Sequence, residues 1–255
     1  MQDAYVGDVG DFGKYGLLNE IHRKSDGKIR LGVNWYYVIE EEKKTGNVRY
    51  TDYLCDNNKN STKYRDCFPG LYDQLRSIVK SNRRNIREIE KGSVLPNETT
   101  FYSEPLPHSS AAPTERKEAR RNWLDQSLKE LDMTDIVFLD PDNGIQTERI
   151  KETQKKARKY AFIHEIQAYY ESGKSLIVYN HRDRTEQSEY RRKLLSAANF
   201  LKPWDEIRAL EFQRLSVRHY LFLIRKEHND LIARTIGTLT REQPCNFLFK
   251  EYPLS

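Results

Sequence analysis

DIVFLDPDNG at residues 135–144 and SLIVYNHR at residues 175–182 decide the fold class of this sequence. Each segment begins with a short apolar run and then turns polar, which is typical of a strand buried on both faces of a parallel sheet. Between them, Tyr160–Ser172 has the apolar spacing of a helix, and Gly173 follows as a candidate C-terminal cap. The order strand, polar loop, helix, strand predicts a βαβ unit.

The segments on either side extend this unit into a larger sheet. Ile29–Ile39 is rich in β-branched and aromatic residues and predicts a further strand. Ile207–Phe212 and Arg218–Ile224 flank a short connection and predict an antiparallel hairpin. We therefore expect an α/β fold with a Rossmann-like mixed sheet and a C-terminal antiparallel hairpin.

The remaining segments predict helices and loops around this sheet. Leu71–Glu90 and Arg116–Leu131 are typical of surface helices, the first interrupted near Ser81. The sequence has no internal repeat and no sharp change of composition. We expect a single domain over residues 1–255, with loop-rich insertions near 40–66 and 96–115.

The composition is that of a polar globular protein. The 255 residues include 43 basic and 38 acidic side chains, which gives a net charge of +5, and 37% are hydrophobic. The longest apolar runs have the length of strands, so we expect no transmembrane helix and no membrane partner. Cys55, Cys67 and Cys245 include no CxxC pair, and we expect them to be unpaired in a cytoplasmic protein. The basic excess favours a polyanionic partner.

The candidate site follows from the predicted sheet. Ligands of open α/β sheets bind beyond the carboxyl ends of the strands, which selects Asn34–Tyr37, Asp140–Asn143 and Asn180–Arg182. Asp140 and Asp142 flank a proline that stiffens the turn, so both carboxylates could face one ligand. The alternative is that PDNG is only a tight turn and that Asp140 caps a helix.

A glycine-rich segment near the N-terminus is the second unusual feature. Tyr5–Leu18, with the sequence YVGDVGDFGKYGLL, has a glycine at every third position and includes Asp11 and Lys14. It matches neither GxGxxG after a strand nor a phosphate-binding loop. It is either a flexible leader or the start of a helix whose amides and Lys14 face an anionic ligand.

Basic clusters follow both deciding segments. The residues we expect to bind nucleic acid, with tyrosines nearby for base stacking, are Lys155, Lys156, Arg158, Lys159, Arg182 and Arg184. The alternative is that these runs are solvated helix faces.

Four motifs in chain order carry a resemblance to a known family. They are Tyr5, Gly10, Asp11 and Lys14 before Leu17-Leu18; Phe68-Pro69-Gly70; Phe138-Leu139-Asp140-Pro141-Asp142-Asn143; and Leu176-Ile177-Val178-Tyr179. This pattern resembles the small bacterial methyltransferases that modify an adenine N6 in large-subunit ribosomal RNA. The resemblance implies a methyltransferase-like fold, S-adenosylmethionine as cofactor and nucleic acid as substrate. The expected C-terminal hairpin matches the antiparallel end of the methyltransferase sheet.

The resemblance also implies roles for individual residues. Asp140 would orient the target amino group, and a flipped base would lie beside Asn143. Trp35 or Tyr36 would contact the adenosine of the cofactor. The full set of candidate cofactor-binding residues is Asp11, Lys14, Asn34, Trp35 and Tyr36.

The sequence departs from the family at two places. Gly32–Tyr37 supplies bulky rings where the family has a glycine-rich turn. Asp142 and Asn143 stand where the family has a second proline and a tyrosine.

These departures leave two further functions open. One is a divalent-metal-dependent nuclease or phosphoesterase, in which Asp140, Asp142 and Glu165 hold Mg²⁺ or Mn²⁺ and His181 acts as acid or base. The other is a catalytically inactive module that binds nucleic acid or a nucleotide. The candidate catalytic residues across the enzymatic hypotheses are Asp140, Asp142, Asn143 and His181. DNA or RNA as substrate, sequence specificity and oligomeric state stay open.

Overall fold

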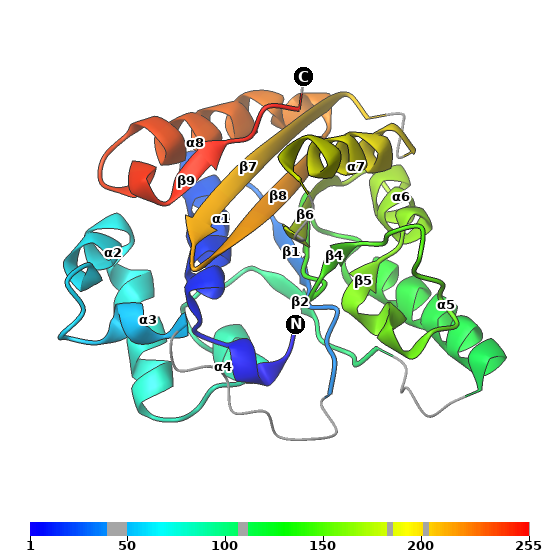
Figure 1. Cartoon of the computed structure of the whole chain (residues 1–255), viewed down its shortest axis with the longest axis horizontal. Helices are drawn as coiled ribbons and strands as arrows, with labels where there is room; N and C mark the ends of the chain where they lie inside the picture. The colour runs from blue at the N-terminus through cyan, green and yellow to red at the C-terminus, as the bar shows by residue number, and fades with distance from the viewer. Residues whose placement is uncertain (40–49, 107–111, 183–185, 201–203, 255) are drawn as a thin grey trace.

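The computed structural model describes residues 1–39, 50–106, 112–182, 186–200 and 204–254 (Figure 1). Within these residues, seven strands form one mixed sheet in the order β2-β1-β3-β6-β8-β7-β9. Its strands are β1 Leu31–Asn34, β2 Thr100–Tyr102, β3 Ile136–Leu139, β6 Ser175–His181, β7 Glu206–Arg214, β8 Ser216–Ile224 and β9 Phe249–Glu251. A separate parallel pair consists of β4 (Gly144–Ile145) and β5 (Tyr160–Ala161).

The sheet has a parallel part and an antiparallel part. β2, β1, β3 and β6 run parallel, with Val33 opposite Phe138 and Phe138 opposite Ile177. β8 runs antiparallel to both β6 and β7, and β9 pairs antiparallel with β7. The expected Rossmann-like α/β fold with a mixed sheet and a C-terminal antiparallel hairpin is confirmed.

Helices cover both faces of this sheet (Figure 1). The first face packs against α1 (Val9–Lys24), α3 (Pro69–Lys80), α4 (Ile86–Lys91) and α8 (Asn229–Arg241). The second face packs against α5 (Pro113–Glu130), α6 (Ile163–Glu171) and α7 (Gln187–Phe200). Alternate residues of β3 serve the two cores: Ile136 and Phe138 face the first, and Val137 and Leu139 face the second.

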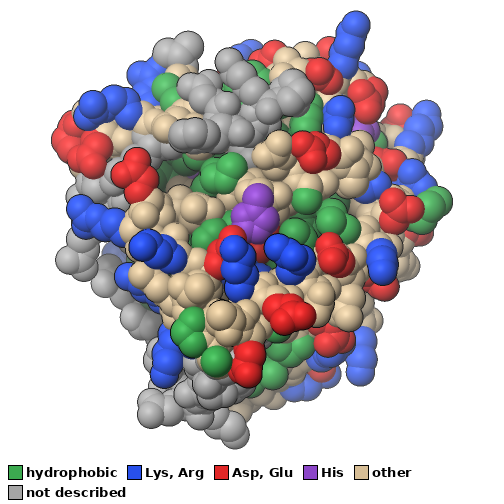
Figure 2. Space-filling model, turned by 90° about the vertical axis from the view of Figure 1, so that its right-hand side faces the viewer, with side chains coloured by type: hydrophobic (Ala, Val, Ile, Leu, Met, Phe, Trp, Pro, Cys, Tyr) green, Lys and Arg blue, Asp and Glu red, His purple; other side chains and the backbone are tan. Residues whose placement is uncertain are grey.

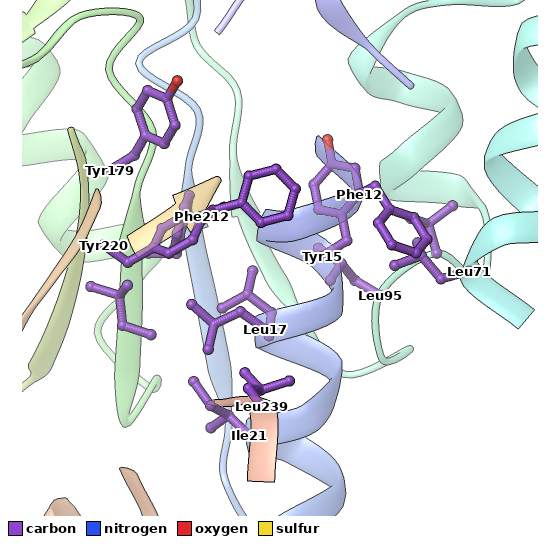
Figure 3. Packing of buried hydrophobic residues seen from close by; sticks show 14 of the residues in the cluster. Phe12, Tyr15, Leu17, Ile21, Leu71, Leu95, Tyr179, Phe212, Tyr220 and Leu239 are labelled. Carbon is purple, nitrogen blue, oxygen red and sulfur yellow. The ribbon is translucent and has the colours of Figure 1, made fainter. Parts of the chain in front are cut away.

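The glycines of α1 allow this helix to approach the sheet and the segment before α3 closely. A Cβ atom at Gly13 would lie 2.7 Å from the ring of Phe212, and one at Gly16 would overlap the ring of Phe68. Figure 3 shows Phe12 and Tyr15 of α1 among the aromatic side chains of this core. The helix begins after Asp8, whose side chain accepts hydrogen bonds from the amides of Gly10 and Asp11. Of the two alternatives for the glycine-rich segment, the structure shows the helix.

Several element boundaries differ from those that the sequence predicts. The first strand ends at Asn34 instead of Ile39, because Tyr36 adopts a left-handed backbone with φ 44°. The hairpin connection shortens to Leu215 alone, which also has a positive φ of 57°. The predicted helix over Leu71–Glu90 is indeed interrupted after Lys80, where α3 ends.

The expected insertions contain regular structure where they are described. Residues 40–49 lie outside the described residues, and α2 (Ser61–Cys67) forms at the end of the first insertion. Residues 107–111 also lie outside them, and β2 falls within the second insertion. Whether the chain is a single domain stays a prediction.

The expectation of three unpaired cysteines was wrong. Cys67 and Cys245 form a disulfide, whereas Cys55 is free and exposed. The two bonded residues are 178 positions apart, so no local spacing indicates that they pair. None of the helices in the described part of the chain is long and apolar enough to cross a bilayer. A cytoplasmic location stays a prediction.

Candidate functional site

The carboxyl ends of the parallel strands β1, β3 and β6 lie at one edge of the sheet, which is where open α/β sheets bind ligands. Asp140 follows β3 directly, and its amide donates to the carbonyl of Asn34 at the end of β1 (2.9 Å). Asn180 lies near the end of β6, where its side-chain oxygen accepts from the amide of Ile145 (2.8 Å). The turn after β3 is thereby tied to both neighbouring strands.

A buried ion cluster joins this edge to α1. The Lys14 Nζ atom lies 2.9 Å from Asp140 Oδ2 and 2.9 Å from Asp11 Oδ1. Asp11 and Lys14 are one helical turn apart, and all three side chains are at most 7% exposed. The second oxygen of Asp11 accepts from the amide of Gly7 (3.1 Å) and the hydroxyl of Tyr15 (3.3 Å). Lys14 is therefore shared between two carboxylates.

The electrostatics of this cluster follow from its burial. Burial raises the pKa of Asp140 and of Asp11, although Lys14 opposes both shifts. Burial alone would lower the pKa of Lys14, but Asp11 and Asp140 raise it well above its usual value. Lys14 thus keeps its proton at neutral pH and stabilises the ionised carboxylates beside it.

The first two residues lie across the same edge, where Figure 1 places the N-terminus. The Met1 nitrogen donates to the carbonyls of Trp35 (2.9 Å), Tyr36 (3.1 Å) and Asp140 (3.1 Å). It also lies 3.0 Å from Asp142 Oδ1, and Gln2 Nε2 donates to the other oxygen of Asp142 (2.7 Å). Asp140 and Asp142 are thus both engaged by other parts of the chain.

The residues after β1 are buried and make internal hydrogen bonds. The Asn34 side chain donates to the Tyr169 hydroxyl (2.7 Å) and accepts from the amide of Tyr36 (2.9 Å). Trp35 packs in the first core, whereas Tyr36 packs in the second and donates to Glu165 (3.2 Å). Contact of Trp35 or Tyr36 with a cofactor would require these side chains to leave their cores.

The aromatic and basic residues beside Lys14 extend the cluster toward β8. The Lys14 ammonium lies 5.0 Å from the ring centre of Tyr179, whose hydroxyl is 3.4 Å from His181 Nδ1. Burial and the nearby Arg218 lower the pKa of His181. Arg218 is only 4% exposed and contacts the first turn of α1 at Gly10. Tyr179 ends the fourth motif of the resemblance but is not among the predicted site residues, and Arg218 is not predicted either, because a strand arginine is unremarkable by itself.

Glu165 has a structural role in α6. It accepts from Arg120 Nη2 (3.0 Å) and from the amide of Phe162 (2.9 Å), which caps the start of the helix. In the part of the chain that is described, no three His, Cys, Asp or Glu side chains are grouped so that they could hold a metal. The structure therefore does not bring Asp140, Asp142 and Glu165 together as a metal site.

The predicted nucleic-acid contacts are only partly gathered at this edge. Lys159 Nζ lies 3.8 Å from Asp142, and the carbonyl of Lys159 accepts from the amide of the exposed Asn143 (2.9 Å). Lys155 and Lys156 are exposed, Arg158 and Arg182 are half-buried, and Arg184 lies outside the described residues. On the side of the molecule nearest α5 and α6, Figure 2 shows basic side chains interspersed with acidic ones.

Comparison with known proteins finds a structural likeness of low sequence identity. No family model and no curated protein matches the sequence. The crystal structure of protein LPL1258 from Legionella pneumophila, whose description names the family model DUF519, is similar to this chain with a TM-score of 0.45 and 11% sequence identity. The likeness covers 97% of this chain and 96% of that chain. A score of this size defines neither the family nor the activity of the protein.

Proposed function

We propose that the protein acts on nucleic acid at the edge formed by β1, β3 and β6, with Asp140 as the group that recognises an amino group of a base. The observation that carries this proposal is the contact of Lys14 with Asp140 at 2.9 Å. These residues belong to the two motifs on which the resemblance to adenine-N6 methyltransferases chiefly rests, and they are 126 positions apart. Their meeting at a ligand-binding edge supports a common site.

The chemistry of the cluster suits recognition of an amino group. An ionised carboxylate accepts hydrogen bonds from an N–H donor, and Lys14 favours the ionised state of Asp140. Lys14 also holds Asp140 in place through its second partner, Asp11. A substrate amino group would reach Asp140 only after Met1 and Gln2 had left the edge, because both residues now cover it.

The residues after β1 do not fit S-adenosylmethionine in this conformation. A glycine-rich turn lets the backbone approach a cofactor, whereas Trp35 and Tyr36 are both fully buried here. We therefore derive no methyl-transfer step from this arrangement. The filled turn favours a second candidate function, a catalytically inactive module that binds nucleic acid.

Calorimetry separates these functions. S-adenosylmethionine is titrated into the wild type, Asp140→Asn and Asp135→Asn, with and without an adenine-containing single-stranded RNA. Asp135 is a matched control, because it precedes the same strand at the opposite edge and pairs with Arg30 (2.6 Å). Micromolar cofactor binding together with methyl incorporation lost only in Asp140→Asn establishes the methyltransferase.

The other outcomes are equally specific. Salt-dependent RNA binding without cofactor binding up to millimolar concentration identifies the inactive module. Manganese-dependent cleavage of RNA or DNA would instead establish the nuclease, against the arrangement of acidic residues described above. If the wild type binds no nucleic acid in low salt, the proposed function is wrong.

A further inference from the structure

The disulfide between Cys67 and Cys245 lies in the wall of a groove outside the candidate site. The groove has a volume of about 410 Å³ and lies between α1, the start of α3 and the end of α8. Cys67 is 9% exposed and Cys245 is 8% exposed, and both line the groove. Both bonded residues therefore have a small part of their surface in the groove.

The charged side chains of the groove are one arginine and two glutamates. Arg23 of α1 is held by hydrogen bonds to Glu20, one of them 2.8 Å long, and Glu242 follows α8. The lining therefore offers an incoming thiolate no net positive charge. Exchange still requires an ionised thiol, because the thiolate is the reactive form of cysteine.

The reduced state has a hydrogen-bond acceptor already in place. Cys245 Sγ lies 3.4 Å from the carbonyl oxygen of Cys67, within the range of a thiol hydrogen bond. After reduction, the Cys245 thiol can donate to this carbonyl without a change of backbone position. The reduced Cys245 thiol therefore keeps a hydrogen-bond partner, although the covalent link between the two segments is lost.

The disulfide joins a segment that packs on α1 to one that packs on α8. Cys67 precedes Phe68, whose ring contacts α1 at Gly16 and lies 5.5 Å from the ring of Phe12. Cys245 opens a short 3-10 helix, Cys245–Phe247, which packs against α8. The same α1 helix carries Asp11 and Lys14. We call the disulfide and the two segments that it joins the clamp of α1. Opening the disulfide should therefore loosen the packing of the helix that positions the ion cluster.

We propose that Cys67 and Cys245 form a reversible redox couple that adjusts the packing of α1. A dithiol reductant supplies the electrons. Its thiolate attacks one sulfur of the disulfide, a mixed disulfide forms, and the other cysteine leaves as a thiolate that takes up a proton. The second thiol of the reductant then displaces the first cysteine, which is also protonated. The reductant becomes a disulfide, and the protein gains two electrons and two protons.

This couple depends on residues distinct from those of the proposed function. Disulfides in reducing compartments are typically transient or regulatory, whereas those of oxidising compartments persist. Accessibility to a dithiol in the folded state distinguishes a reversible couple from a permanent crosslink, whichever compartment holds the protein.

Thiol counting on the folded protein tests the proposal. The wild type and Cys55→Ser are equilibrated in dithiothreitol buffers of graded potential, and reactive thiols are counted by alkylation and mass spectrometry. We expect the count in the wild type to rise from Cys55 alone to all three cysteines, and to fall again on oxidation. Cys55→Ser, the matched control, should show the same transition from no thiol to two.

Hydrogen exchange then reports on α1. Reduction should leave the far-ultraviolet circular dichroism unchanged and accelerate amide exchange over Gly13–Leu18 by about tenfold, because this part of the helix loses its clamp. Exchange in α5, on the other face of the sheet, should stay the same. The proposal is overturned if the oxidised protein already has three reactive thiols, if reduction requires a denaturant, or if exchange in α1 does not change. Every deciding measurement is made on the wild-type protein, and Cys55→Ser serves only as a control.

Discussion

Each face of the sheet has a buried ion pair between a helix and a distant segment, and the two pairs differ in how completely they are satisfied. On the second face, Arg120 donates to Glu165 and also to the carbonyls of Ala157 (3.0 Å) and Tyr160. Glu165 in turn accepts from Phe162 and Tyr36, so its oxygens have several donors. The pair is thus hydrogen-bonded to several segments of the second face, including the buried Tyr36 after β1.

On the first face, a single lysine serves two carboxylates at the end of the strands. Lys14 holds Asp11 and Asp140, and among the described residues only Lys14 donates a hydrogen bond to the side chain of Asp140. The difference separates a structural ion pair from a cluster that could exchange a partner for a ligand. The free energy of unfolding should depend most on the Arg120–Glu165 pair, and its pH dependence should depend most on the Lys14 cluster.

The largest expected effect is that of Arg120→Ala. This change leaves the carboxylate of Glu165 buried without its cation, which should lower the free energy of unfolding by about 3–5 kcal/mol. Urea denaturation measures the loss. Lys117→Ala on the same helix is the control, because Lys117 is 58% exposed and its change should stay within about 0.5 kcal/mol. Equal effects of the two changes would contradict a structural role for Arg120.

Lys14→Met should cost less, about 2–3 kcal/mol near pH 7, because a buried carboxyl group that loses its cation can take up a proton. Burial raises the pKa of Asp140 above its usual 3.8, so this group favours folding most below that pH and less as the pH rises through its folded value. Without Lys14 this loss is no longer offset. The deficit relative to the wild type should therefore grow between about pH 4 and 7. Unfolding measured across this range would refute the expectation if the deficit were constant.

Gly13→Ala tests the close approach of α1 to the sheet. The new Cβ atom would lie 2.7 Å from Phe212 and 2.9 Å from the Tyr220 hydroxyl, so unfolding should become easier by about 1–3 kcal/mol. In α8, Gly237 has no atom within 4 Å of the corresponding position. Gly237→Ala should therefore stabilise the protein by about 0.5–1 kcal/mol. Thermal denaturation of both variants should show shifts of opposite sign.

The smallest effect concerns Tyr179, beside Lys14. Burial raises the pKa of this phenol from 10.0 to about 12, although Arg218 and Lys14 oppose the shift. The neutral phenol therefore favours folding fully below pH 10, and this contribution is lost as the pH rises through about 12. Tyr179→Phe should flatten the alkaline loss of stability slightly, since Tyr37 and Tyr102 also have pKa values raised to about 12. An unchanged alkaline slope in denaturation experiments would count against this assignment.

The sequence predicts the interior of the fold better than its turns. The apolar runs of β3 and β6 carry enough local information to identify buried strands, and the PDNG turn after β3 is equally local. The end of β1 was not predictable, because Trp35 and Tyr36 are typical strand residues by composition. Their departure from the strand is accompanied by a hydrogen bond that the amide of Tyr36 donates to the side-chain oxygen of Asn34.

The candidate site was predicted as separate pieces. Asp140 was selected by its position after a strand, and Lys14 by the glycine-rich segment around it. Their contact depends on how α1 packs against the sheet, which local patterns do not encode. The pairing of Cys67 with Cys245 and the burial of Arg218 depend on tertiary structure in the same way. Glu165 was predicted as a metal ligand because a carboxylate suits Mg²⁺ or Mn²⁺, and its true partner Arg120 lies 45 positions away in the chain.

The outermost strands of the sheet have a consequence for self-association. β2 and β9, the outermost strands within the described residues, each span three residues. A strand of this length presents few unpaired N–H and C=O groups, so another sheet finds little to pair with. The long strands β7 and β8, whose backbone groups would form a far better template for aggregation, lie inside these short edges. The C-terminal strand therefore covers Leu210–Phe212 of the outer hairpin strand against pairing with other molecules.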